Sequence, residues 1–150
     1  MKLRPPRLHV LVFAVAFTLP GLLALTAARP AFADAILTLD HGSTWITLKD
    51  GEDTQGFVQI HNTGDAPDTL TKANCTIAAS TTLVDASGNP LQSLVIPAGQ
   101  SVTLSPKGPH LLIKAARYQV KKNSILPCAF TFSGSSDLVG YLNAVPPPKS

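Results

Sequence analysis

The sequence predicts an all-β domain, built as a sandwich or barrel, behind an N-terminal export signal. Short runs rich in β-branched residues alternate between apolar and polar positions. Turn residues separate these runs about every 8–12 positions, a spacing typical of sandwiches and barrels. No run keeps a helical period of apolar residues over several turns, so helices are not expected.

The first 33 residues have the organisation of a secretory signal peptide. Basic residues open the chain, and an apolar run follows from Leu8 to about Ala27. Ala31-Phe32-Ala33 is a small-x-small site, so we expect residues 1–33 to be cleaved off after Ala33. The alternative is an uncleaved membrane anchor, because the run approaches the length of a membrane span. The segment contains no cysteine, which excludes a signal that acylates a cysteine.

Cleavage would change the charge of the protein. The whole chain carries 12 Lys and Arg and 9 Asp and Glu residues, and four of the basic residues lie in the predicted signal. The mature chain, residues 34–150, therefore has a net charge of −1. This charge gives no reason to expect nucleic acid or a membrane surface as a partner. We expect a periplasmic or secreted protein without membrane contact after cleavage.

Five strands are expected in the first half of the domain, at residues 35–40, 43–51, 56–65, 68–76 and 80–90. A turn-like segment, LDHGS, separates the first two. In the third run, Val58 and Ile60 share one face, whereas Phe57 lies on the opposite face with the other odd-numbered residues. Residues 62–65 and 87–90 are rich in Asn, Gly, Asp and Ser and are expected to form turns.

The second half of the domain repeats this organisation. Residues 93–106 read as two short strands around Pro97-Ala98-Gly99, and three more runs follow at residues 110–116, 125–134 and 138–145. We therefore expect one β-sandwich domain over residues 34–145. The Pro-rich tail, residues 146–150, cannot pair in a sheet and should be extended and disordered.

The motifs of common enzyme classes are absent from the sequence. It contains no glycine-rich phosphate loop, no HExxH and no G-x-S-x-G. The acidic residues stand mostly at turn positions, where they serve turn geometry and solubility. With no paired acid and base in sight, we expect a protein that is not an enzyme and has no catalytic residues.

Three histidines of the mature chain are candidate metal ligands: His41, His61 and His110. Converging imidazoles can hold Cu(II) or zinc. Each histidine also has an ordinary structural interpretation. His41 lies in the turn-like segment, His61 comes just before a turn, and His110 begins a strand. The residues alone leave both interpretations open.

The mature chain contains two cysteines, Cys75 and Cys128. Because export leads to an oxidising compartment, a disulfide between them is expected. Their spacing fits no CxxC redox or zinc motif. The alternative is two separate buried thiols.

Two segments of the domain carry more than a generic β pattern. They are GFVQIHNTGDAPDTLTKA, residues 56–73, and LVIPAGQSVTLSPKGPHLLI, residues 94–113. The first resembles the Ile-x-Asn-Thr-Gly-Asp … Asp-x-Leu segment of the PCu(A)C family of periplasmic copper chaperones. The second is similar to that family's Ile-Pro-Ala-Gly-Gly-x-Val-x-Leu-x-Pro-Gly-Gly-x-His segment. Residues 121–145 match its final strands in length and pattern, so the resemblance covers roughly Ile36 to Val145.

This resemblance implies a single cupredoxin-like, immunoglobulin-like β-sandwich that binds Cu(I) through two histidines and two methionines. It also implies transfer of copper toward cytochrome oxidase assembly. The implied partner is a periplasmic copper-accepting or oxidase-assembly protein.

The ligand positions depart from the family pattern. His110 falls on the histidine of the family's H-x-M ligand motif, but Leu112 stands at the methionine position. The other two ligands belong to a loop before Ile-Pro-Ala-Gly, and here the corresponding TTLVDASGNPLQS contains neither His nor Met. The one methionine of the chain is Met1, within the predicted signal. A Cu(I) site without cysteine depends on thioether sulfur, so we expect the usual site to be largely lost.

Two functions remain open at this stage. The first is a copper-handling protein with a remodelled site, in which His110 is joined by His61, His41 or the N-terminal amine of Asp34. Such a site would favour Cu(II), and copper would be its cofactor. The second is a metal-free β-sandwich that acts by binding another exported protein.

Overall fold

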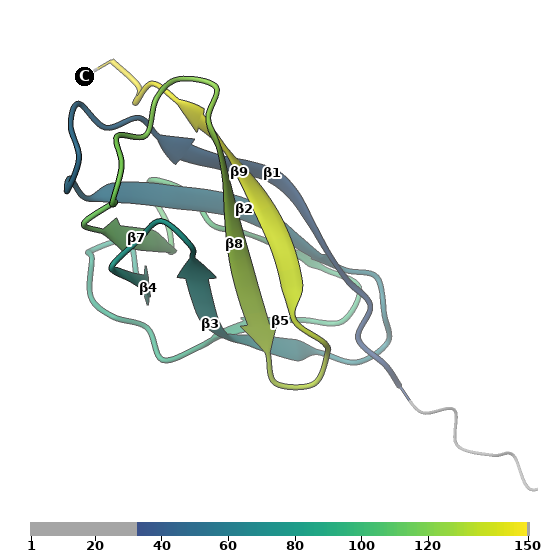
Figure 1. The fold of residues 1–150 in the computed structure, drawn as a ribbon. Helices are drawn as coiled ribbons and strands as arrows, with labels where there is room; N and C mark the ends of the chain where they lie inside the picture. Colours follow the sequence, from purple (N-terminus) through teal and green to yellow (C-terminus); the bar gives the residue numbers. More distant parts are fainter. Residues whose placement is uncertain (1–32, 150) are drawn as a thin grey trace, which may run out of the picture. The chain divides into compact units, whose positions relative to one another are not determined.

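The computed structural model describes residues 33–149 (Figure 1). Of the predicted signal peptide, residues 1–33, the first 32 residues lie outside the described part of the chain. The described part is all-β, with strands β1 Leu37–Trp45, β2 Thr54–Asn62, β3 Asp68–Cys75, β4 Ser80–Val84, β5 Leu94–Ile96, β6 Ser101–Thr103, β7 His110–Lys114, β8 Ile125–Phe132 and β9 Leu138–Val145. No helix long and apolar enough to cross a membrane occurs in this part of the chain.

The strands form one curled mixed sheet with the order β4-β7-β2-β1-β9-β8-β3-β5, and β6 pairs with β2. All neighbours are antiparallel except β1 and β9, which pair in parallel at Ser43–Trp45 and Asn143–Val145. The β4-β7-β2-β1 half packs against the β9-β8-β3-β5 half, as in a sandwich (Figure 1). The parallel pair joins the two halves into one sheet. The predicted fold class is therefore confirmed.

The core lies between the two halves of the sheet. The even-numbered residues of β2, including Val58 and Ile60, point into it and meet Leu70 of β3 and Phe130 of β8. These four side chains are between 0% and 2% exposed. The alternation predicted for this strand is confirmed, because Phe57 is not part of the core cluster and lies on the opposite face.

The disulfide between Cys75 and Cys128 is present. The two residues are directly opposite each other in the β3–β8 register, and both are almost fully buried. The bond therefore joins the neighbouring strands β3 and β8 on the side of the sheet that faces the core. The predicted pairing is confirmed.

The beginning of the domain differs from the prediction. The expected turn at His41-Gly42 lies inside β1 as a bulge, where the β1–β2 register shifts between Asp40 and Ser43. His41 adopts a φ of 50°, which is uncommon outside glycine. A side chain at Gly42 would collide with the carbonyl oxygen of Tyr141, so glycine permits the close approach of β1 to β9. The chain therefore continues as one strand where a break was expected.

The predicted strand 43–51 is also shorter in the structure, because β1 ends at Trp45. Beyond it, the Thr47 amide donates to the Val120 carbonyl, and the Thr47 hydroxyl accepts from the Val120 amide. These bonds hold Thr47 against Val120, which lies in an irregular loop, so Thr47 does not pair with a neighbouring strand. Leu48 next to it is 82% exposed, so its alternation with polar residues does not reflect a buried face.

Asn62 at the end of β2 organises the start of the domain. It is 2% exposed, and its side chain makes four hydrogen bonds. Its Oδ1 accepts from the Ile36 and Gly64 amides, and its Nδ2 donates to the carbonyls of Ala66 and Ile96. Every hydrogen-bonding capacity of the carboxamide is thus used, as a buried polar group requires.

Asp68 has a similar role at the start of β3. Its Oδ1 accepts hydrogen bonds from the Thr69 amide, the Gly134 amide and the Ser133 hydroxyl, which fixes the β8–β9 turn. Burial raises the pKa of this carboxyl. Hydrogen bonds from Ser135, Thr69, Gly134 and Ser133 outweigh that effect and leave its pKa below the usual value of 3.8.

Candidate functional site around His110

His110 and Leu112 point to the outer face of β7. Strand residues alternate, and Leu111 and Ile113 belong to the core cluster, so His110 and Leu112 project the other way. The H-x-M-like spacing of the sequence therefore does place both side chains on one face. Val84 of β4 is the cross-strand partner of His110.

Apolar side chains surround His110 on this outer face. We call Trp45, Phe57, Val84, His110 and Leu112 the outer cluster. The rings of His110 and Phe57 are 6.3 Å apart, and Trp45 meets Phe57 edge-on at 5.2 Å. His110, Phe57 and Val84 are 6%, 6% and 1% exposed, so the outer cluster is a second small apolar core. The structure buries His110, although its position at a strand start suggested an edge residue.

The imidazole of His110 is held in one orientation. Its Nδ1 lies 3.0 Å from the carbonyl oxygen of Gly108. A carbonyl only accepts, so Nδ1 carries the proton and donates, and the lone pair of the neutral ring lies on Nε2. Histidines that bind metals commonly use this arrangement, with Nδ1–H on a backbone carbonyl. His110 is therefore oriented as a ligand would be, and the turn at residues 107–109 provides that orientation.

His61 is separated from His110 along β2. It lies four residues beyond Phe57, which corresponds to roughly 13 Å at about 3.3 Å per residue. Its Nδ1 shares a 2.6 Å hydrogen bond with the hydroxyl of Ser101 on the neighbouring strand β6. Asp34 lies further still from the outer cluster, since its carbonyl accepts from the Asp65 amide beyond the end of β2.

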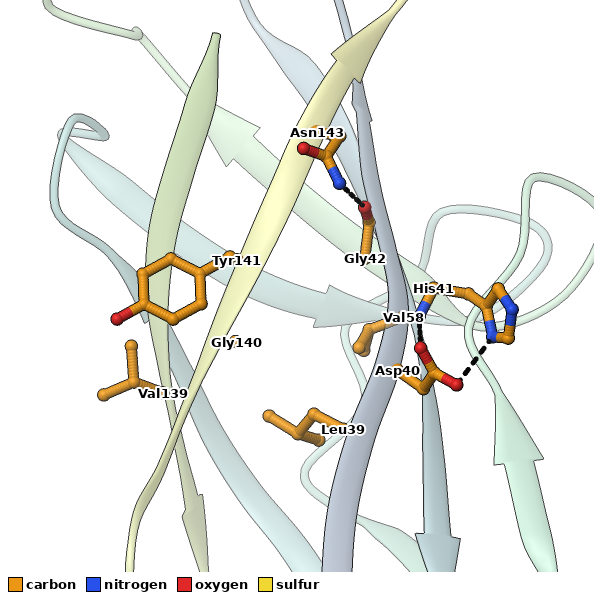
Figure 2. A pocket seen from close by; sticks show the side chains of 9 residues that line it. All are labelled: Leu39, Asp40, His41, Gly42, Val58, Val139, Gly140, Tyr141 and Asn143. Atoms are coloured by element: carbon orange, nitrogen blue, oxygen red, sulfur yellow. Dashed lines mark hydrogen bonds and ion pairs between the residues drawn. The ribbon is translucent and has the colours of Figure 1, made fainter. Parts of the chain in front are cut away.

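His41 is exposed and faces a different neighbour. Its Nδ1 lies 3.2 Å from the Asp40 carboxylate, and its side chain is 75% exposed. Figure 2 shows the imidazole turned toward Asp40 and away from Tyr141 and Val139 of β9. Together with Gly140, these residues line a hollow of about 400 Å³ between β1 and β9. Asp40 and His41 are the His, Cys, Asp or Glu residues among its lining, fewer than the three that would form a metal-binding group.

The three candidate histidines therefore do not converge on one site. Within residues 33–149, no group of three or more His, Cys, Asp or Glu side chains could hold a metal ion. The neighbours of His110 that matter most, Val84 and Phe57, were not singled out from the sequence. The alternation of TTLV places Val84 on the face of Thr82, but only the β4–β7 register brings that face to His110.

The comparisons with known proteins agree with the fold. No curated protein matches the chain by sequence. The sequence model of the family described as "Putative lipoprotein LpqE-like" matches residues 37–139. The only two cysteines of the chain are joined in the disulfide, so neither is free to carry a lipid. None of the matched descriptions names an enzymatic activity.

Several solved structures are similar to the chain. "Apo PCuAC domain from PmoF1" has a TM-score of 0.67 and 22% identity, and the match covers 74% of this chain and 94% of that one. "Copper-bound PCuAC domain from PmoF2" has a TM-score of 0.66 and 16% identity, with coverage of 74% and 93%. The copper(I) form of DR1885 from Deinococcus radiodurans has a TM-score of 0.55 and 20% identity, with coverage of 79% and 85%. These likenesses confirm the fold that the sequence resemblance implied.

Proposed function

The chain belongs to the LpqE-like family and has the fold of PCuAC domains, and from this premise we propose that it is an exported copper chaperone-like protein whose usual His/Met Cu(I) site is largely lost. The observation that carries the proposal is the outer cluster. The neighbours of His110 on its face include Val84, Phe57 and Leu112, none of which can donate an electron pair to copper.

The chemistry of Cu(I) supports this proposal. Cu(I) prefers soft sulfur donors, thioether or thiolate, over a single imidazole. Met1 is the only methionine of the chain, and it lies in the predicted signal. Both cysteine sulfurs are joined in the buried disulfide. Residues 34–149 therefore offer Cu(I) no thioether or thiolate.

A remodelled Cu(II) site finds less support. It would need His61, His41 or the amine of Asp34 within about 4 Å of His110, since copper–imidazole distances are about 2.0–2.1 Å. His61 bonds Ser101, His41 pairs with Asp40, and Asp34 is tied to Asp65. The two histidines thus have partners of their own away from the outer cluster, and the bond to the Asp34 carbonyl keeps that residue at the far end of β2.

We place the mature protein, after cleavage following Ala33, in the periplasm or outside the cell and free of the membrane. Its partner in this proposal is an exported copper-accepting or oxidase-assembly protein.

The alternative, a metal-free β-sandwich that acts through protein contacts, is favoured by one observation. Ile125, Val139 and Tyr141 are 60%, 57% and 63% exposed, and the three lie on the paired strands β8 and β9. Neighbouring exposed apolar side chains are typical of protein-binding surfaces.

Competitive titration of the mature protein with Cu(I) and Cu(II) tests the proposal. We expect Cu(I) affinity no greater than that of the His110→Ala variant. The gain-of-function control is Val84→His combined with Leu112→Met, which sets a second imidazole directly opposite His110 and a thioether two residues away. Cross-strand Cβ atoms are about 4.5–5.5 Å apart, within reach of one metal ion. This variant should bind Cu(I) more tightly than the natural protein.

Stoichiometric, tight Cu(I) binding by the natural protein that disappears in His110→Ala would contradict the proposal. Matched thermal unfolding of all variants shows whether a change in affinity reflects the site or loss of folding.

A further inference from the structure

The C-terminal tail leaves the sheet beside Trp45, the only tryptophan of the chain. Strand β9 ends at Val145, which pairs with Trp45 and accepts a hydrogen bond from the Ile46 amide. The chain then continues as three prolines, Pro146 to Pro148. Proline has no amide to donate, so this segment leaves the sheet without pairing.

Two hollows flank Trp45, and the tail prolines line both of them. Pro146 and Pro148 line a hollow of about 420 Å³ together with Trp45 and Phe57. Pro147 lines a second hollow of about 240 Å³ together with Trp45 and Leu112. Pro146 and Pro148 thus border one hollow beside Trp45, and Pro147 borders the other. Trp45 is half-buried, and the three prolines beside it are exposed.

Gln55 adds a polar group to the second hollow. Its Oε1 is buried without a hydrogen-bond partner in the described part of the chain. Leu112 lies opposite Gln55 in the β2–β7 register, so the carboxamide lies beside the apolar wall of the hollow. A buried carboxamide oxygen without a partner is costly. It can only accept, so the missing hydrogen bond has to come from the amide of a non-proline residue in an incoming segment.

These features match the way proteins recognise extended proline-rich segments. Such segments adopt the polyproline II helix with little loss of entropy, and they dock on aromatic grooves that carry a few hydrogen-bonding side chains. Trp45 supplies the aromatic surface, with the buried ring of Phe57 packed edge-on against it, and Gln55 supplies the polar group. The chain's own tri-proline segment shows what kind of backbone this surface accepts.

We propose that the surface formed by Trp45, Gln55 and Leu112 is a docking site for an extended, proline-rich segment of another protein, and that Pro146–Pro148 borders and partly covers it while that partner is absent. The tail and the partner compete for one surface. A partner's apparent dissociation constant is therefore raised by the reciprocal of the fraction of molecules in which the tail is displaced. The proposal goes beyond the copper question and uses none of its chemistry.

The test uses the mature protein and a synthetic peptide with the tail's own sequence, acetyl-Val-Pro-Pro-Pro-Lys-Ser-amide. Trp45 fluorescence reports on the site directly, because no other tryptophan is present. In a variant with Pro146, Pro147 and Pro148 replaced by Ser, acrylamide should quench Trp45 more strongly than in the natural chain. The peptide should restore the protection, and it should bind this variant more tightly than the natural chain.

Three controls make the result specific. Gln55→Ala in the serine-tail background should weaken peptide binding, whereas Tyr118→Ser, at an exposed loop position, should leave it unchanged. A peptide with alanine in place of proline should not bind. Unchanged quenching in the serine-tail variant, or equal binding of the proline and alanine peptides, would overturn the proposal. Concentration-dependent dimers of the serine-tail variant would overturn it too, because a second copy would then be the occupant.

Copper titrations keep this proposal separate from the previous one. Tight Cu(I) binding at His110 would remove the proposed function and leave the docking site standing. Failure of the peptide to bind would remove the docking site and leave the proposed function standing.

Discussion

Loss of the Cys75–Cys128 disulfide should remove much of the stability of this domain. The two cysteines are separated by 53 residues in the chain. In the chain-entropy description, a cross-link that closes a loop of this length stabilises the folded state by about 4 kcal/mol. A typical domain has a free energy of unfolding of about 5–15 kcal/mol, so this one bond supplies a large share. Four kcal/mol corresponds to nearly a thousandfold in the folding equilibrium.

Denaturant unfolding with and without a thiol reductant measures this contribution. Both cysteines are almost fully buried, so reduction should require unfolding and should be slow without denaturant. The reduced protein should unfold at lower denaturant concentration, and its m-value should rise because the unfolded chain expands. The double variant Cys75→Ala, Cys128→Ala is the matched control. It should have low stability from the start and should not respond to reductant.

A difference below about 1 kcal/mol between oxidised and reduced protein would refute this reasoning. It would mean that the β3–β8 register holds without the covalent bond and that the unfolded chain already keeps the two cysteines close.

Three further predictions concern the buried polar groups and one glycine. Asn62→Ala should lower the free energy of unfolding by about 2–4 kcal/mol, because it removes the four hydrogen bonds that the side chain makes to backbone groups. Denaturant unfolding should show this loss. Gly64→Ala should detach the segment at Asp34, since the added Cβ collides with the Asp34 carbonyl oxygen, and hydrogen exchange at the Asp65 amide should accelerate while core amides stay protected. Asp68, whose pKa is lowered in the folded protein, should contribute stability that is present above its unfolded pKa near 3.8 and lost as pH falls through the lower folded pKa. Asp68→Asn should flatten the acid side of the stability–pH curve, and an unchanged curve would contradict this assignment.

The β pattern of the sequence predicted most of the strands because it depends on local alternation. Val58 and Ile60 were correctly assigned to one face of β2 and Phe57 to the other, and the core confirms this. The disulfide was predictable because the chain has two cysteines, which allow a single pairing, and the export signal directs them to an oxidising compartment. These features need no knowledge of which strands are neighbours.

Features that depend on non-local pairing could not be predicted in this way. The bulge at His41 exists because Gly42 lets β1 approach Tyr141 on β9, a contact between residues about a hundred positions apart. The burial of His110 beside Val84 depends on the β4–β7 register. The resemblance to a copper-chaperone family located His110 and Leu112 on one strand, but only the structure shows the apolar side chains that enclose the imidazole.

The state of the His110 imidazole in the presence of Cu(I) tests the central claim most directly. Cu(I) is diamagnetic, so long-range ¹H–¹⁵N spectra of the mature protein can follow the three imidazoles separately during addition of one equivalent. We predict that the Nε2 resonance of His110 stays where it is in the metal-free protein, with Nδ1 still protonated and donating to the Gly108 carbonyl. A stoichiometric shift of His110 Nε2 to the position of a metal-bound nitrogen would contradict the account.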